Sequence, residues 1–332
     1  MKKSLLALAV LGAFAGVASA QSSVTLFGVV DLNARYVKND GVARRVSLSQ
    51  DGINSSRLGF RGTEDLGGGL SAQFWLEGGV NADTGTTNAK FFGRRSTVSL
   101  VGGFGEVRLG RDYTPTFWNQ TFYDVFGTVG LGDSLTVAQL TSNTFVRADN
   151  SIGYFLPAKL GGLFGQAMVA AGEGVAAGKY VGGRLGFGAG PFEVAAAYAQ
   201  QNTDTGDKHK TMNLGGSFDF GVAKLMGYYD RDTLASLKEN RYSISGLVPM
   251  GQGEIHAGYE RSKLQDSTLS TSNTISKFAV GYVYNLSKRT AVYSTVARLS
   301  NGSLSQATIG SAPLPDFGGK STGAEFGVRH IF

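Results

Sequence analysis

Glu325-Phe-Gly-Val-Arg-His-Ile-Phe332 ends the chain, and the alternation in this stretch decides the fold. Successive side chains of an extended strand point to opposite faces. One face therefore carries Phe326, Val328, His330 and Phe332, and the other carries Glu325, Gly327, Arg329 and Ile331. A largely apolar face opposite a mostly polar face is typical of a transmembrane β-barrel strand, which has lipid on one side and water on the other. We predict that the apolar face, Phe326, Val328, His330 and Phe332, forms the assembly signal of such a barrel.

The amino terminus has the three parts of a cleavable export signal. Lys2 and Lys3 give a positive start, residues 5–17 an apolar core, and Ala18-Ser19-Ala20 a small-residue cleavage site. We predict that residues 1–20 are a signal peptide and that residues 21–332 form a single barrel domain. A short core helix is the alternative, but the three features occur in the order that a signal requires.

Composition narrows the class of protein. The chain has no cysteine, 49 glycines, 13 tyrosines and 21 phenylalanines, and its formal net charge is +6. Without cysteine there is no disulfide framework, iron–sulfur cluster or cysteine-ligated zinc, and we predict no cofactor and no metal. Beyond the signal, no apolar run approaches the roughly 18 residues of a membrane-spanning helix.

Short alternating segments recur along the whole chain, separated by long polar loops and tight turns in alternation. Most have about 9 to 11 residues, the length that crosses a bilayer at a tilt of about 45°. About sixteen segments fit: 24–37, 54–64, 70–80, 91–101, 106–113, 150–157, 163–172, 179–188, 192–201, 211–220, 222–231, 240–248, 254–263, 275–284, 289–299 and 322–332. An even number of antiparallel strands closes without a free edge, so we predict an all-β transmembrane antiparallel barrel of about 16 strands.

The longest break in this pattern, between Tyr113 and Asn150, is rich in aromatic residues. It carries Phe117, Trp118, Phe122, Tyr123 and Phe126. A break of this length is uncommon in a compact protein unless it has a function, and a solvent-exposed tip would seldom hold so many aromatic side chains. We predict that it folds into the lumen and narrows it. The alternative is a surface loop that grips a neighbouring subunit.

The arginines in the strands indicate which face of each strand lines the aqueous lumen. Arg57 and Arg61 share a face, and Leu58 and Phe60 lie on the opposite one. Because a lipid-facing arginine at mid-membrane costs about 2 to 4 kcal/mol, we predict that both arginines face the lumen.

The same argument applies to two other strands. It places Asp31, Asn33 and Arg35 in the lumen. Of Arg94 and Arg95, the alternation with Thr97 and Ser99 favours Arg95 inside, although a bulge would reverse this assignment.

The sequence contains one part of an enzymatic motif but lacks the rest of it. Gly132-Asp-Ser-Leu135 matches the tetrapeptide of GDSL esterases, whose triad needs a histidine with an aspartate three residues earlier. The residues three positions before His209, His256 and His330 are Gly206, Gly253 and Gly327, so no catalytic pair is available. We predict no catalytic residue and no enzymatic activity. Three scattered histidines also make no spaced metal cluster.

Four stretches carry a family resemblance. They are Ser56-Arg-Leu-Gly-Phe-Arg-Gly-Thr-Glu-Asp-Leu-Gly-Gly-Gly-Leu70, Gly102-Gly-Phe-Gly-Glu-Val-Arg-Leu-Gly-Arg111, Arg147-Ala-Asp-Asn-Ser-Ile152 and Gly327-Val-Arg-His-Ile-Phe332. They resemble the general porins of Gram-negative bacteria of the β-proteobacterial type, over essentially the whole chain after the signal. The resemblance implies a homotrimer in the outer membrane, with the third extracellular loop folded inward as the constriction.

In the resembled family, arginines from the early strands form a basic wall that faces the inward loop. The matching positions here are Arg57, with Arg94 or Arg95, while Arg61 shares the lumenal face. Arg147 is a weaker candidate. Many relatives carry a further arginine where this chain has Gly153.

Acidic residues are expected opposite the basic wall. Asp112 and Asp124 are the candidates on the loop. The alternative is that the arginines only neutralise buried acids and stiffen the barrel.

The expected function follows from the size of the barrel. A barrel of about sixteen strands is too wide for its side chains to fill, so a water channel remains for small hydrophilic solutes and ions. The guanidiniums predict a modest preference for anions that weakens at high salt. A substrate-specific channel and a structural or adhesive barrel are the alternatives. The partners expected are two further copies of the chain, outer-membrane lipid or lipopolysaccharide, and small solutes, but no nucleic acid.

Overall fold

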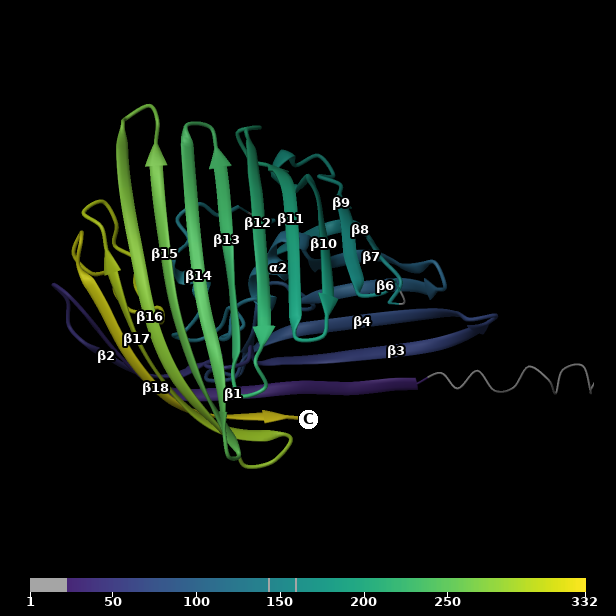
Figure 1. Ribbon diagram of the computed structural model, residues 1–332, viewed down its shortest axis with the longest axis horizontal. Coiled ribbons are helices and arrows are strands. Elements are labelled where there is room, and N and C mark those ends of the chain that lie inside the picture. Colours follow the sequence, from purple (N-terminus) through teal and green to yellow (C-terminus); the bar gives the residue numbers. More distant parts are fainter. Residues whose placement is uncertain (1–22, 143, 159) are drawn as a thin grey trace, which may run out of the picture.

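The computed structural model describes residues 23–142, 144–158 and 160–332, which form a closed antiparallel β-barrel (Figure 1). Within these residues, sixteen strands make up the wall, as the sequence predicted, and each pairs with the next one along the chain. The predicted signal peptide, residues 1–20, lies outside the described residues, as do Gln21 and Ser22. The wall strands are β1 (Ser23–Asn39), β3 (Arg57–Gly67), β4 (Leu70–Asn81), β6 (Arg95–Gly102), β7 (Gly105–Tyr113), β8 (Arg147–Phe155), β9 (Leu163–Ala170), β10 (Tyr180–Ala189), β11 (Phe192–Asn202), β12 (Lys208–Asp219), β13 (Lys224–Leu234), β14 (Leu237–Met250), β15 (Gly253–Asp266), β16 (Thr271–Asn285), β17 (Thr290–Asn301) and β18 (Lys320–Ile331).

The first and last strands close the wall. β18 pairs with β1 along one edge, and the start of β1 pairs with β3 along the other. Gly28 N donates to Phe332 O at 3.0 Å, and Phe332 N donates to Gly28 O at 3.1 Å. A Cβ at position 28 would lie 2.3 Å from the ring of Phe332, so glycine is required where the terminal aromatic side chain packs. In Figure 1 the C-terminal end, marked C, lies beside β1, drawn in purple.

Five elements in the described residues were not predicted from the sequence. They are the short strands β2 (Arg45–Gln50) and β5 (Thr86–Thr87), the helix α2 (Pro115–Phe122) and two 3-10 helices, η1 (Ser134–Val137) and η2 (Ala176–Gly178). The strand expected at residues 91–101 begins only at Arg95, because a turn closed by Gly93 N and Lys90 O, 3.0 Å apart, comes before it.

Side-chain alternation separates the lumen from an apolar exterior. Asp31, Asn33 and Arg35 of β1 are buried inside, whereas Val30 and Tyr36 are exposed outside. In β18 the exposed face carries Phe326, Val328, His330 and the chain end Phe332. In the described part of the chain, no helix is long and apolar enough to cross a membrane.

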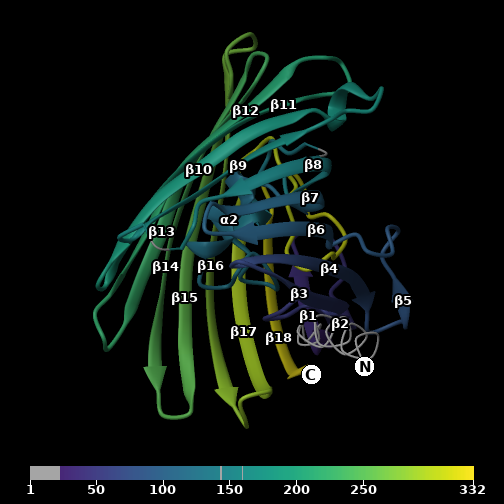
Figure 2. The same ribbon diagram turned by 90° about the vertical axis from the view of Figure 1, so that its right-hand side faces the viewer.

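Residues 114–146, which we call the constriction loop, fold into the barrel as the sequence predicted. Figure 2 shows α2 within the ring of strands. The helix begins at Thr114, whose side chain accepts a hydrogen bond from Phe117 N, and Pro115 occupies its first turn. A short 3-10 helix, η1 (Ser134–Val137), follows.

The constriction loop is hydrogen-bonded to the inner wall from β11 to β18. Asn119 donates to Ala195 O at 2.8 Å, and Leu140 N donates to Glu239 Oε2 at 2.7 Å. Leu131 N donates to Glu325 Oε1 at 3.3 Å. Polar side chains on one side of the lumen are therefore occupied by the loop.

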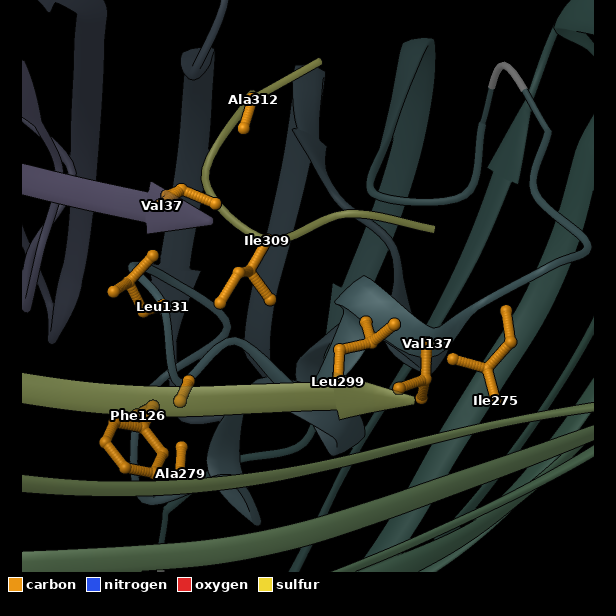
Figure 3. Packing of buried hydrophobic residues seen from close by; sticks show 10 residues of the cluster. Val37, Phe126, Leu131, Val137, Ile275, Ala279, Leu299, Ile309 and Ala312 are labelled. Atoms are coloured by element: carbon orange, nitrogen blue, oxygen red, sulfur yellow. The ribbon is translucent and has the colours of Figure 1, made fainter. Parts of the chain in front are cut away.

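A second loop, residues 302–319 between β17 and β18, also enters the lumen. Its Ile309 and Ala312 belong to a buried apolar cluster with Leu131 of the constriction loop and Val37 of β1 (Figure 3). The other buried members are Phe126, Val137, Ile275, Ala279, Ala297 and Leu299. Burial of a large apolar side chain stabilises by about 1.5–3 kcal/mol, so this cluster holds the two loops against the wall.

Candidate functional site

A cavity of about 390 Å³ lies between the constriction loop and the wall at the start of β3, just before β6, at the end of β7 and at the start of β8. The wall contributes Arg57, Arg94, Tyr113 and Arg147, and residues 53–55 before β3 also line the space. The loop contributes Phe117, Trp118, Thr121, Gly127, Thr128, Val129, Asp133 and Leu135. The charged wall and the constriction loop face each other across this cavity.

Glu77 of β4 holds two of the arginines in place. Arg94 Nε donates to Glu77 Oε1 at 2.6 Å, and Arg57 Nε lies 3.8 Å from the same oxygen. Trp75 Nε1 donates to the other oxygen, Glu77 Oε2, at 3.0 Å. Both guanidiniums therefore interact with the same carboxylate oxygen of Glu77.

Tyr113, the last residue of β7, connects the remaining arginine to this pair. Its hydroxyl accepts from Arg94 Nη2 at 3.1 Å and from Arg147 Nη2 at 2.6 Å. Arg147 Nε also donates to the backbone oxygen of Arg94 at 2.8 Å, and its guanidinium lies 4.2 Å from the centre of the Tyr113 ring. The ring of Tyr113 stacks on Phe117, so the wall and the loop are in contact here.

Both Arg94 and Arg95 turn inward, which the sequence left open. Arg95 shares the lumenal face of β6 with Thr97 and donates to its hydroxyl at 3.0 Å. Arg94 precedes β6, outside the strict alternation of the strand, and reaches the lumen through Glu77.

A second basic group lies further along the lumen, toward the short turns. The guanidinium of Arg61 lies 5.2 Å and that of Arg95 4.6 Å from the centre of the Trp75 ring. Arg108 of β7 pairs with Glu106 at 2.7 Å and also with Asp112. The cavity at the constriction includes Arg57, Arg94 and Arg147, whereas Arg61 and Arg95 lie beside it.

Of the two acids expected opposite the basic wall, Asp112 contacts arginines of the wall, but from β7 and not from the loop, and Asp124 does not reach the wall. Asp112 belongs to β7 and is paired with Arg108, with Arg95 Nε 4.0 Å away. Asp124 is in the loop, but its carboxylate accepts from the backbone N–H groups of Phe126, Thr128 and Ser134 at 2.9 to 3.1 Å. A carboxylate that satisfies three backbone donors of its own loop organises the loop and is not available to the wall.

The acid that does line the cavity from the loop is Asp133. Its Oδ1 accepts from Leu135 N at 2.8 Å and so caps η1. Burial raises the pKa of Asp133 to about 6, against the opposing effect of Lys277. The residues of the GDSL-like tetrapeptide, 132–135, have structural contacts. Tyr228 donates to Ser134 Oγ at 2.8 Å, which attaches this part of the constriction loop to β13.

Sequence reasoning missed Glu77 and Tyr113. Glu77 was detectable, because it alternates with Leu76 on a strand where Trp75 and Gln73 share its face. Tyr113 carried no comparable signal, since its role depends on a bulge between Gly110 and Asp112 that shifts the register of β7 against β8.

Comparison with known proteins matches the chain along nearly its whole length. Residues 7–304 match the profile of the Gram-negative porin family. The chain is 42% identical over 359 residues to the outer membrane porin protein 32 of Delftia acidovorans, with 100% of each chain covered. It is 28% identical over 401 residues to an outer membrane porin protein of Bordetella pertussis, again with 100% of each covered. Both relatives are named as porins.

Solved structures agree with this match. The anion-selective porin from Comamonas acidovorans superposes with a TM-score of 0.83 at 39% identity, covering 94% of this chain and 100% of that one. OmpT of Vibrio cholerae, folded in vitro, has a TM-score of 0.71 at 16% identity and covers 95% of this chain and 99% of its own. At that identity the likeness concerns the fold alone.

Proposed function

The chain belongs to the Gram-negative porin family and forms a water-filled channel in the outer membrane; we propose that its constriction prefers anions. The preference is modest, because carboxylates accompany the arginines at the narrow point. The relative from Comamonas acidovorans is described as anion-selective, which agrees with this proposal.

The balance of charge in the cavity carries the proposal. Three guanidiniums, those of Arg57, Arg94 and Arg147, line it, and Asp133 lines it from the loop. Glu77, beside the cavity, adds one further carboxylate that is shared by two of the arginines. The excess of one positive charge favours anions, although each arginine also has a structural partner.

The geometry also explains why such a small excess matters. Low-dielectric walls focus the field of fixed charges in a narrow aqueous space, so a solute in this cavity senses them more strongly than it would in bulk water. Guanidinium remains charged at all relevant pH values and presents planar donors that suit carboxylate and phosphate.

The experiment is a measurement of reversal potential in a planar bilayer under a potassium chloride gradient. We expect the potential to have the sign of chloride preference and to shrink as salt is raised, because screening shortens the range of the field. Potassium preference at low salt would contradict the proposal. Saturation of the current by one solute would instead indicate a substrate-specific channel.

We also propose that the protein is a homotrimer, as the family resemblance implies. The mass of the detergent-solubilised protein, measured by light scattering and corrected for detergent, should be that of three chains. A mass of one chain at concentrations where the channel is active would contradict this assembly.

A further inference from the structure

Several arginines of the inner wall lie over aromatic rings. Within the described residues, six guanidiniums have their central carbon 4.0 to 5.4 Å from the centre of a ring. They belong to Arg61, Arg95, Arg108, Arg147, Arg184 and Arg241. At this distance a guanidinium is attracted by the ring through a cation–π interaction, and its planar group can stack on the ring. The wall thus presents positive charge and aromatic surface together.

Arg61 of β3 differs from the other five, because it has no polar partner in the described part of the chain. Each of the others is hydrogen-bonded to an acid, a hydroxyl or a side-chain amide. Arg61 instead lies over the rings of Phe27 and Trp75, 5.3 and 5.2 Å from their centres, and the residue is exposed to the lumen. Its charge and its N–H donors are therefore available to a solute.

The two rings beside Arg61 are held in fixed positions. Phe27 of β1 lies directly opposite Gly59 of β3, and a Cβ at position 59 would lie 2.5 Å from the Phe27 ring, so glycine is required for the ring to lie against the wall. Trp75 of β4 lies opposite Arg61 and is fixed by its hydrogen bond to Glu77. The two rings meet edge to face, with their centres 4.9 Å apart.

A second guanidinium completes this surface. That of Arg95 lies 4.6 Å from the centre of the Trp75 ring, so two cations flank the same ring. We call Phe27, Arg61, Trp75 and Arg95 the aromatic patch. The acid paired with the patch, Asp112, lies 4.0 Å from Arg95 Nε and also pairs with another arginine of β7. The aromatic patch therefore has more positive than negative charge.

The chemistry of the aromatic patch suits a flat organic anion better than a spherical one. A chloride ion interacts with the guanidiniums through charge alone. A planar aromatic carboxylate can accept two parallel hydrogen bonds from Arg61 and can also stack on a ring or on the flat face of a guanidinium. An aliphatic carboxylate has the first contact but not the second. The patch therefore distinguishes carboxylates by their aromatic ring.

We propose that the aromatic patch is a binding site for aromatic carboxylates that pass through the channel. The inference rests on the proposed anion preference and names the class of anion that the lumen retains longest. The patch lies toward the short turns, which face the periplasm in barrels of this kind, so an entering solute meets it after the constriction. It is an open surface and not a closed pocket. Binding is therefore weak enough for the solute to leave, as conduction requires.

The test compares two carboxylates that differ in the ring alone. Benzoate is flat and aromatic, whereas cyclohexanecarboxylate has the same charge and a saturated ring of the same number of atoms. Each is titrated against the chloride current in a planar bilayer, and the concentration that gives half of its maximal reduction is measured. Aromatic stacking contributes about two- to tenfold beyond the area buried, so benzoate should act at a concentration lower by that factor. Equal concentrations in the wild type would overturn the proposal.

Substitutions assign the difference to the aromatic patch. Trp75→Leu removes the ring between the two guanidiniums, and Phe74→Leu is the matched control, because Phe74 is its neighbour on β4 and points outward. We expect the two carboxylates to act at the same concentration on Trp75→Leu, and the control to keep the wild-type difference.

A second substitution tests the patch without disturbing the hydrogen bond between Trp75 and Glu77. Phe27→Leu removes the other ring and should reduce the difference between the two carboxylates. It decides alone if Trp75→Leu yields no channels. A full wild-type difference in Phe27→Leu would overturn the proposal, as would one in Trp75→Leu.

The reversal potential in potassium chloride separates failure of this inference from failure of the proposed function. Both carboxylates carry one negative charge, so the ion preference of the channel affects them equally and cancels in their ratio. Potassium preference with stronger action of benzoate would contradict the anion preference and support the aromatic patch. Chloride preference with equal action of the two would support the anion preference and overturn the aromatic patch.

Discussion

The two halves of the inner wall carry the same kinds of residue but give them different partners. On β3, β4 and β6–β8, arginines face an open cavity, and the side chain of Arg57 is 27% exposed. On β11–β16 the constriction loop covers the wall, and the side chain of Arg241 is only 1% exposed. Arg241 pairs with Asp230 at 2.5 Å, and the same carboxylate accepts from Gln120 of the loop at 2.6 Å.

This difference shows that alternation makes the lumenal face polar but does not decide what its charged side chains contact. The position of the constriction loop decides which of them pair with the loop and which line the cavity. Where the loop lies against the wall, charged side chains hydrogen-bond to it, and where it lies across from the wall, arginines line the cavity. Substitutions on the two sides should therefore affect different observables.

The largest effect is expected from Arg241→Ala on the covered half. The substitution leaves the buried carboxylates of Asp230, Asp232 and Glu239 without their shared cation, which costs about 3–5 kcal/mol. We expect the folded barrel to be lost at a lower temperature, and single channels to become noisy because Glu239 and Asp230 anchor the loop. Circular dichroism during heating and channel recordings would measure the two effects. The matched control is Arg231→Ala, which lies on the outer face of β13 and should change neither.

The next effect is expected on the open half, in ion preference rather than stability. A unit charge ~10–12 Å from an ion in water contributes about 0.35–0.4 kcal/mol, with opposite sign for chloride and for potassium, which is about three- to fourfold in the ratio of their permeabilities. Arg57→Gln combined with Arg94→Gln should therefore lower the ratio of chloride to potassium permeability about tenfold, measured by reversal potential. The charge-preserving double variant, with lysine at both positions, should retain most of the ratio. If it behaved like the glutamine variant, hydrogen-bond geometry and not charge would control the preference.

A change of opposite sign is expected from Glu77→Gln. Removing the carboxylate shared by Arg57 and Arg94 should raise the same permeability ratio about three- to fourfold. The control is Glu64→Gln, an exposed residue near the other end of β3. A fall in the ratio would mean that Glu77 acts mainly by holding the two arginines in the cavity.

The smallest effect is expected from pH, through Asp133. Because burial raises the pKa of Asp133 to about 6, lowering the pH from 7.5 to 5 protonates it and removes a negative charge from the cavity. The chloride preference should rise by no more than about threefold over this range. Asp133→Asn should abolish the pH dependence, and an unchanged dependence would assign it to another group.

The same carboxyl has a defined effect on stability. A folded-state pKa above the ordinary value of 3.8 means that the folded chain binds the proton more tightly than the unfolded chain does. The resulting stabilisation is fully present below about pH 3.8 and is lost as the pH rises through about 6. The contribution of Asp133 should therefore make the folded form resist heat better at pH 5 than at pH 7.5, and Asp133→Asn should reduce that difference.

The wall was predictable from the sequence because alternation is a local property. The alternation of residues within each strand shows which side faces the lumen and which faces lipid. Neighbours in the chain were therefore enough to infer the sixteen strands, the lumenal position of Arg57 and the outward position of Phe326. The inward loop was predictable as well, since its aromatic residues required burial.

The partners of the charges were not predictable, because they depend on contacts between distant segments. Asp124 looked available for an arginine, yet the turn after α2 brings three backbone donors to it. Arg94 lay inside the segment predicted at 91–101, but it precedes β6 in the structure, and the pairing of β4 with β6 brings it to Glu77. A charge can be assigned to a face from sequence, but not to a partner on the other side of the barrel.

The apolar cluster in the lumen links the attachment of the two lumenal loops to the order in which the barrel assembles. It needs Val37 from the first strand, Leu299 from the penultimate strand and Ile309 from the last loop, so it cannot form before the two ends of the chain have met. Contacts between residues so far apart in sequence form late and slowly during folding. The attachment of the two lumenal loops through this cluster is therefore complete only after the wall has closed.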